Sequence, residues 1–152
     1  MQKFYFKLQP LLNKERIYED ECVGRLGVIQ DTFHNEKIKL ENLKRGKLIS
    51  QSELNSKKKQ DITSEELRTY EDYFLKLGRS IDASKSRIQE ISKELDTVRD
   101  ELFEIVKKRK ALEKLRDRWE EEYKSDLAFM SNREMDDIAM TKYINRLVAE
   151  ND

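Results

Sequence analysis

Few side chains in this sequence have the type and spacing that catalysis or metal binding requires. Cys22 would act as a nucleophile only with a general base nearby, and its surroundings supply none. The one histidine, His34, has no second histidine and no neighbouring cysteine with which to complete a metal site or a catalytic triad. We therefore predict no catalytic residue, no metal ligand and no cofactor, with Cys22 a small buried side chain and His34 solvated.

Two other patterns suggest phosphate chemistry. Gly24 and Gly27 have a G-x-x-G spacing, but no strand precedes them and no Lys-Ser or Lys-Thr pair follows, so they do not form a nucleotide loop. Within a helix they indicate either close approach to another helix or a soft point. The basic runs at 57–59 and 107–110 are expected to be solvated, and 31 basic against 31 acidic residues argue against a nucleic-acid partner.

The elements that carry these residues follow from a heptad pattern in the second half of the chain. Steps alternate between three and four residues, and every position except Ser84 is apolar or aromatic. Such a repeat predicts a helix with an apolar seam against a partner helix. The positions are Leu67, Tyr70, Phe74, Leu77, Ile81, Ser84, Ile88, Ile91, Leu95, Val98, Leu102 and Ile105.

The first half repeats this spacing with more polar exceptions and supplies a partner. Its positions are Leu8, Leu12, Glu15, Glu19, Cys22, Leu26, Ile29, Phe33, Glu36, Leu40, Leu43, Lys47, Ser50 and Leu54. Between the halves lies a polar stretch. Thr63 and Glu66 then have the spacing of a capping box, and Pro10 suits the first turn of the first helix.

We therefore predict an all-α protein, a long two-helix antiparallel coiled-coil hairpin whose second helix is the longer. A single hairpin over 1–152 has helix one at about 9–56, a connector at about 57–62 and helix two at about 63–145. Charged residues make up 41% of the chain, as in long solvated helices. A two-helix layer lacks the enclosed pocket of an enzyme or a small-molecule site, so we expect a binding module, a spacer or a shaft.

Folding at about residue 59 places Pro10 opposite Arg109 and leaves roughly forty later residues without a partner. This overhang holds Trp119 and many later apolar side chains, including Met130. Such a surface needs a cover, either from a different protein or from the tail itself by bending back or dimerising.

Three stretches, one near the start of the chain and two in its last third, resemble a known family. Residues 6–12 (FKLQPLL) resemble the F-[RK]-L-Q-P-L-L opening of the FliJ family of flagellar export proteins. Residues 116–119 (RDRW) and 133–139 (REMDDIA) resemble its closing pattern of arginines followed by an acidic pair and a small residue. The chain has Lys7 where the family more commonly has arginine, and Met135 where an aliphatic residue or lysine is usual.

The resemblance implies a cytoplasmic component of the flagellar type III export apparatus, peripheral to the membrane at the flagellar base and required for motility. Its implied partners are the hexameric export ATPase, the membrane export gate and export chaperones. It also implies a coiled coil like a central stalk, which helps the ATPase ring assemble, links the ring to the gate and cycles chaperones. No uncharged run is long enough to cross a bilayer.

Two surfaces fit these partners. Aromatic and methionine side chains often concentrate binding affinity. We expect Tyr73, which lies off the seam, to be exposed for the gate, although it would also serve to cover the seam. The expected contacts are Phe6, Leu8, Trp119, Tyr123 and Met130 for the ATPase ring, and Tyr70, Tyr73 and Leu77 for the gate.

Two alternatives remain open at this point. One is a structural or regulatory spacer that self-associates by pairing two hairpins. The other is the equivalent stalk of a virulence type III secretion system.

Overall fold

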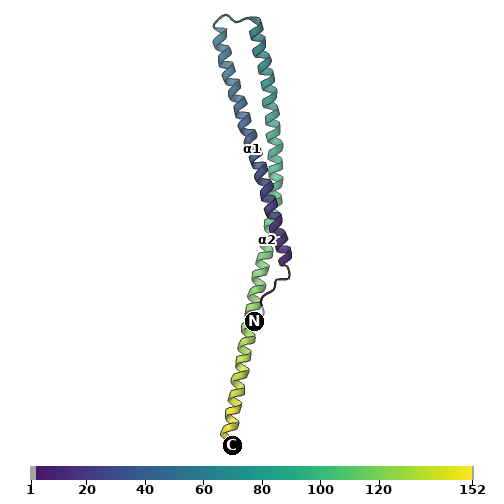
Figure 1. Cartoon of the computed structure of the whole chain (residues 1–152), viewed down its shortest axis with the longest axis vertical. Helices are drawn as coiled ribbons and strands as arrows, with labels where there is room; N and C mark the ends of the chain where they lie inside the picture. The colour runs from purple at the N-terminus through teal and green to yellow at the C-terminus, as the bar shows by residue number, and fades with distance from the viewer. Residues whose placement is uncertain (1–2, 152) are drawn as a thin grey trace. The chain divides into compact units, whose positions relative to one another are not determined.

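The structure is a computed structural model that describes residues 3–151, and in that range it contains two α-helices and no strand. Helix α1 spans Gln9–Lys58 and helix α2 spans Ser64–Asn151. They pack against each other as a helical hairpin with the second helix longer, which confirms the predicted fold (Figure 1). The expected ends were 9–56 and 63–145, so α2 continues further than its sequence pattern indicated.

The ends next to the connector are set by local chemistry. The backbone N–H of Glu66 donates to the Thr63 hydroxyl at 3.2 Å, and the N–H of Leu67 donates to the Thr63 carbonyl at 3.1 Å. Thr63 is therefore the N-cap of α2, as the capping-box spacing predicts. Lys57 and Lys58 lie in the last turn of α1, where positive charge offsets the partial negative charge of the carbonyl end.

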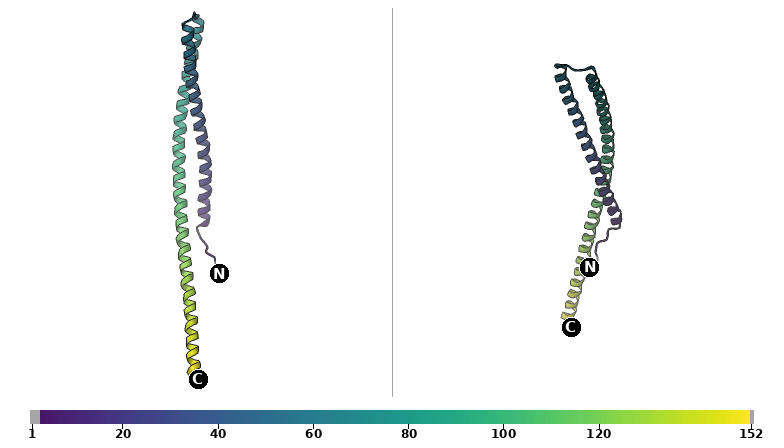
Figure 2. Two further views of the ribbon diagram at one scale, coloured as in Figure 1. Left: turned by 90° about the vertical axis from the view of Figure 1, so that its left-hand side faces the viewer. Right: turned by 45° about the horizontal axis from the view of Figure 1, so that its top comes forward.

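The described residues divide into two compact units. Unit 2 is Tyr18–Glu104, and unit 1 combines residues 3–17 with residues 105–151. In unit 2 the two helices run side by side from the connector, as two further views show (Figure 2). The buried side chains of this unit lie on the predicted seam, and they are Cys22, Leu54, Leu77, Ile81, Ser84, Leu95 and Val98.

The predicted spacing describes burial along both helices. None of the twelve positions from Leu67 to Ile105, and none of the fourteen from Leu8 to Leu54, is exposed. The polar positions follow the pattern as well, because Glu15, Glu19 and Lys47 are half-buried. Position on the helix therefore decides whether a side chain is protected from solvent here, whether that side chain is apolar or charged.

Two smaller expectations concern residues in α1. Cys22 is fully buried, and its thiol donates to the Val98 carbonyl at 3.7 Å, as expected for a small buried side chain. Close approach of helices does not explain Gly24 and Gly27, because a Cβ built on either would meet nothing within 4 Å. That part of the prediction was wrong, and the soft point remains the interpretation of this pair.

Candidate functional site

The N-terminal residues 3–8, which we call the strap, precede α1 and lie against α2 within unit 1. Phe6 is 4% exposed and packs its ring on Trp119 edge to face, with centroids 5.3 Å apart and planes at 74°. The Phe4 ring lies 5.7 Å from that of Tyr123, while Tyr5 between them is 76% exposed. This alternation is typical of an extended chain whose even positions face the helix.

The spacing of the two ring pairs has a simple geometric basis. Two residues of extended chain span about 6.6 Å, at 3.3 Å each. Four residues of helix rise about 6 Å, at 1.5 Å each. Phe4 and Phe6 can therefore match Tyr123 and Trp119, which are one turn apart on α2.

The base of the strap is fixed to the start of α1. The Gln9 N–H donates to the Phe6 carbonyl at 3.1 Å, and the Leu12 N–H donates to the Leu8 carbonyl at 3.0 Å. Pro10 lies in this first turn, where its missing N–H leaves no gap in the bonding. Leu12 is fully buried and Leu8 half-buried, so the turn carries apolar contacts as well as hydrogen bonds.

A charged cluster lies beside this aromatic surface in unit 1. Arg109 donates from Nη1 to both Glu113 carboxylate oxygens at 3.0 Å, and Arg16 from α1 reaches the same carboxylate at 3.4 Å. The hydrogen bond from Arg109 is the main reason that the pKa of Glu113 is lowered, and Arg16 adds to it against the opposing effect of burial. The cluster joins α1 to α2 next to the strap.

The uncovered part of α2 begins later than the sequence indicated. The expectation placed it after Arg109, but Trp119 and Tyr123 are half-buried under the strap. The reason is that an extended chain advances about twice as far per residue as a helix. Helix lengths alone therefore underestimate how far along α2 the N-terminal residues reach.

Residues 124–151, which we call the tail, are all exposed, and in Figure 1 the tail lies beyond the rest of unit 1. The tail carries large apolar side chains that are between 42% and 68% exposed. They are Leu127, Phe129, Met130, Met135, Ile138, Met140, Tyr143, Ile144, Leu147 and Val148. Met130, an expected ATPase contact, is 64% exposed and available to a partner.

The second predicted surface lies near the connector in unit 2. Tyr73 is 43% exposed, as expected from its position off the seam. Tyr70 is half-buried, and the Lys57 ammonium lies 5.3 Å from the centre of its ring. A hydrogen bond with Tyr70 is the main cause of a raised pKa for Lys57. Leu77 is 8% exposed and belongs to the seam, so Tyr73 presents the accessible surface of this group.

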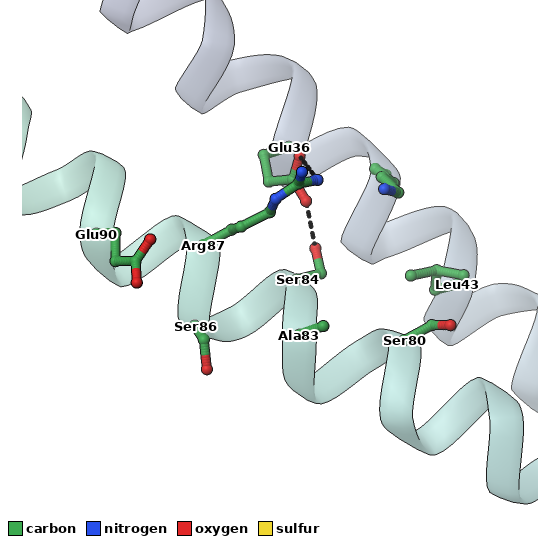
Figure 3. A pocket seen from close by; sticks show the side chains of 9 residues that line it. Glu36, Leu43, Ser80, Ala83, Ser84, Ser86, Arg87 and Glu90 are labelled. Atoms are coloured by element: carbon green, nitrogen blue, oxygen red, sulfur yellow. Dashed lines mark hydrogen bonds and ion pairs between the residues drawn. The ribbon is translucent and has the colours of Figure 1, made fainter.

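A polar pair, Ser84 and Glu36, interrupts the seam in unit 2. The sequence shows both residues as polar exceptions, but their contact was not predicted. Ser84 is 2% exposed and donates to the Glu36 carboxylate at 3.1 Å, while Arg87 forms an ion pair with the other carboxylate oxygen at 3.8 Å (Figure 3). The signal was present, because Ser84 and Glu36 are each the polar exception within an apolar stretch of seam. A shallow pocket beside this pair is lined mainly by polar and small side chains.

The heptad spacing of α2 continues beyond Ile105, the last predicted position of the seam. Arg109, Leu112, Arg116, Trp119 and Tyr123 extend the alternating steps beyond Ile105, and all of them are half-buried. The two arginines had concealed the pattern, because their long apolar stems can lie on a seam while the guanidinium groups reach its edge.

The remaining candidates for chemistry stay apart from one another. His34 is exposed, and Cys22 is buried within unit 2. No group of histidine, cysteine or acidic side chains suited to a metal ion occurs among the described residues. No helix in residues 3–151 is both long and apolar enough to span a membrane.

Comparison with known families decides the assignment. The model of the family described as "Flagellar FliJ protein" matches residues 3–147, nearly the whole chain. The chain belongs to the FliJ family. It is therefore a protein associated with flagellar type III export, which confirms the resemblance of its two ends. No curated protein and no solved structure gave a significant match.

FliJ family membership also gives the coarse biological setting. The family is a non-catalytic component of flagellar protein export, and its members associate with the export machinery. The match extends through the strap, both helices and most of the tail, so it covers both predicted binding surfaces.

Proposed function

We propose that this chain acts as a central-stalk-like coiled coil of the flagellar export apparatus. In this role it promotes assembly of the export ATPase ring, links the ring to the membrane export gate and assists the cycling of export chaperones. The observation that carries the proposal is the tail of α2, whose large apolar side chains are exposed along its whole length. Exposed apolar surface of this extent marks a protein–protein contact.

The proposed ATPase-binding site consists of Trp119, Tyr123 and Met130 on α2. The other two expected contacts, Phe6 and Leu8, belong to the strap, where Phe6 packs on Trp119. Successive steps of four and three residues place Trp119, Tyr123, Leu127 and Met130 on one face of the helix. Methionine and aromatic side chains suit such a site because they offer large contact areas and, for methionine, an adaptable shape.

The proposed gate-binding surface lies around Tyr73 in unit 2, with Tyr70 beside it and Leu77 beneath. Tyr73 presents 43% of its surface to solvent, next to the Lys57–Tyr70 contact. An exposed aromatic ring with a nearby positive charge suits a partner surface that has an apolar centre and acidic side chains at its edge.

The ATPase role can be tested by mixing the purified chain with the export ATPase of the same organism and following hexamer formation and ATP turnover. Stimulation of both at substoichiometric chain supports the proposal. Met130→Glu should abolish the stimulation, because it places a charge in the apolar surface. Ser131→Glu adds the same charge at the adjacent exposed position, off that face, and should leave the stimulation intact.

The gate role needs its own measurement, binding of the chain to the cytoplasmic domain of the gate protein. Tyr73→Ala should weaken this binding without changing ATPase stimulation. Leu75→Ala serves as the control, since Leu75 is 62% exposed but lies on another face of the helix turn. Equal binding by the wild type and Tyr73→Ala would remove the gate from this surface.

Self-association is the alternative that the exposed tail also supports. A second copy would cover the apolar side chains of both tails. Sedimentation at micromolar concentration distinguishes the two functions, because a stalk sediments as an elongated monomer and a spacer as a stable dimer. A dimer that persists in the presence of the ATPase would favour the spacer.

A further inference from the structure

We propose that the strap, residues 3–8, is a displaceable cover that hides part of the ATPase-binding face of α2 and must leave before the partner binds fully. This inference rests on the proposed function and adds a means of regulation to it. The covered part is the aromatic pair Trp119 and Tyr123, and the covering side chains are Phe6 and Phe4.

The first argument is one of accessibility. Phe6 is 4% exposed because its ring lies on Trp119. Neither ring can present that buried side to another protein while they remain in contact. A partner that uses Trp119 as an anchor therefore has to separate it from Phe6.

The second argument is continuity of the surface. Trp119 and Tyr123 lie on the same helix face as Leu127 and Met130, which follow Tyr123 by one and two turns. Leu127 and Met130 are 42% and 64% exposed. The strap thus covers one end of a longer apolar stripe and leaves the rest open. A partner that engages the open part meets the edge of the strap next and can compete with it for the aromatic pair.

The third argument concerns how firmly the strap is held. Burial of two phenylalanine side chains and their two ring contacts together contribute about 4–9 kcal/mol, and ordering a segment of six residues costs conformational entropy of similar size, about 6–12 kcal/mol. The closed and open forms therefore differ little in free energy, and a competing partner can shift the balance. Departure of Phe4 and Phe6 breaks one hydrogen bond at the base of the strap, from the Gln9 N–H to the Phe6 carbonyl, and α1 continues from Gln9 onward.

Trp119 is the only tryptophan, so 5-fluorotryptophan labelling yields one ¹⁹F signal at the covered face. In the free chain, Phe6→Ala should move this signal toward the position of a solvated indole and raise the affinity for the export ATPase about tenfold, as expected if about nine-tenths of the chains are closed. Tyr5→Ala changes a residue of the same strap that is 76% exposed and should alter neither quantity.

Strap departure can be observed directly with a spin label on Lys3→Cys. In the free chain the oxidised label should broaden the Trp119 signal relative to the reduced, diamagnetic label, and addition of the ATPase should abolish this label-dependent broadening. Cys22 is fully buried and does not compete for the label.

A second variant protects the affinity measurement against loss of folding. Should Phe6→Ala lose helicity, Phe6→Leu keeps an apolar side chain over Trp119 and should give a smaller gain in affinity in the same direction.

The outcomes separate the two proposals. A Phe6→Ala chain that binds the ATPase equally or more weakly, while wild type binds, overturns the cover and leaves the proposed function standing. Persistent broadening of the Trp119 signal in the complex overturns it in the same way. Absence of ATPase binding by wild type and variants alike overturns the proposed function, and with it the site that the strap is inferred to cover.

Discussion

The hydrogen bond between Ser84 and Glu36 allows one perturbation to be worked out in energy. Ser84 is 2% exposed, and the Glu36 side chain is 12% exposed. A hydrogen bond to a charged group contributes about 1.5–3 kcal/mol. Alanine recovers about 0.5 kcal/mol through its higher helix propensity. Ser84→Ala should therefore lower the free energy of unfolding by about 1–2.5 kcal/mol.

The double variant Glu36→Leu/Ser84→Ile should behave in the opposite way. Replacing a buried polar pair by apolar side chains that fit is often neutral or stabilising, by up to about 4 kcal/mol. Arg87 contributes little to this balance, because its side chain is 63% exposed and 3.8 Å from Glu36. The double variant should therefore be at least as stable as the wild type, although each single change removes a partner.

The assay is urea unfolding at pH 7 followed by circular dichroism at 222 nm, on the wild type, Ser84→Ala, the two single variants Glu36→Leu and Ser84→Ile, and the double variant that combines these two. The two single effects should fail to add by at least about 1 kcal/mol. Ser86→Ala, at an exposed position one half-turn away, is the control and should stay within about 0.5 kcal/mol. Strictly additive free energies would refute the conclusion that the pair acts as a unit.

Three further predictions concern stability. Glu113→Gln should destabilise the chain at pH 7 by less than about 1 kcal/mol, because the group is partly exposed. The lowered pKa of Glu113 means that its contribution is present above its unfolded pKa of about 4.3 and disappears as the pH falls through the lower folded value, so the difference in urea unfolding between variant and wild type should shrink steadily as the pH is lowered below about 4.3. Leu12→Ala should cost about 2–5 kcal/mol because Leu12 is fully buried, whereas Leu11→Ala, at a 45% exposed neighbour, should cost far less in the same assay. Gly24→Ala and Gly27→Ala should each raise the thermal midpoint, since each adds about 0.5–1 kcal/mol of helix propensity and a Cβ meets nothing within 4 Å; a lower midpoint would mean that these glycines are needed by the fold.

The seam was predictable because burial in a two-helix pair depends on periodicity, which is visible in sequence. The same heptad spacing assigned Leu77, Leu95, Glu15 and Lys47 to the seam. In the structure the two leucines are buried and the two charged residues are half-buried. The cap at Thr63 was predictable for a similar reason, because the interaction joins residues three apart.

The strap could not be predicted in the same way. Its residues follow no helical period, and the position it reaches on α2 depends on the change from helical to extended rise. The sequence identified Phe6 and Trp119 as members of one surface but gave no reason to expect them in contact. The Ser84–Glu36 bond was missed because pairing across a hairpin requires the register, which the polar connector does not specify.

The complete burial of Cys22 beside the Val98 carbonyl makes the reactivity of its thiol a measure of how often the two helices separate. A thiol reagent can modify the sulfur only when α1 and α2 part at this level. In the limit of fast closing, the modification rate divided by that of an unfolded peptide equals the fraction of time spent parted. Measured alone and on the export machinery, this ratio would report whether the loaded hairpin is strained open or held more tightly shut.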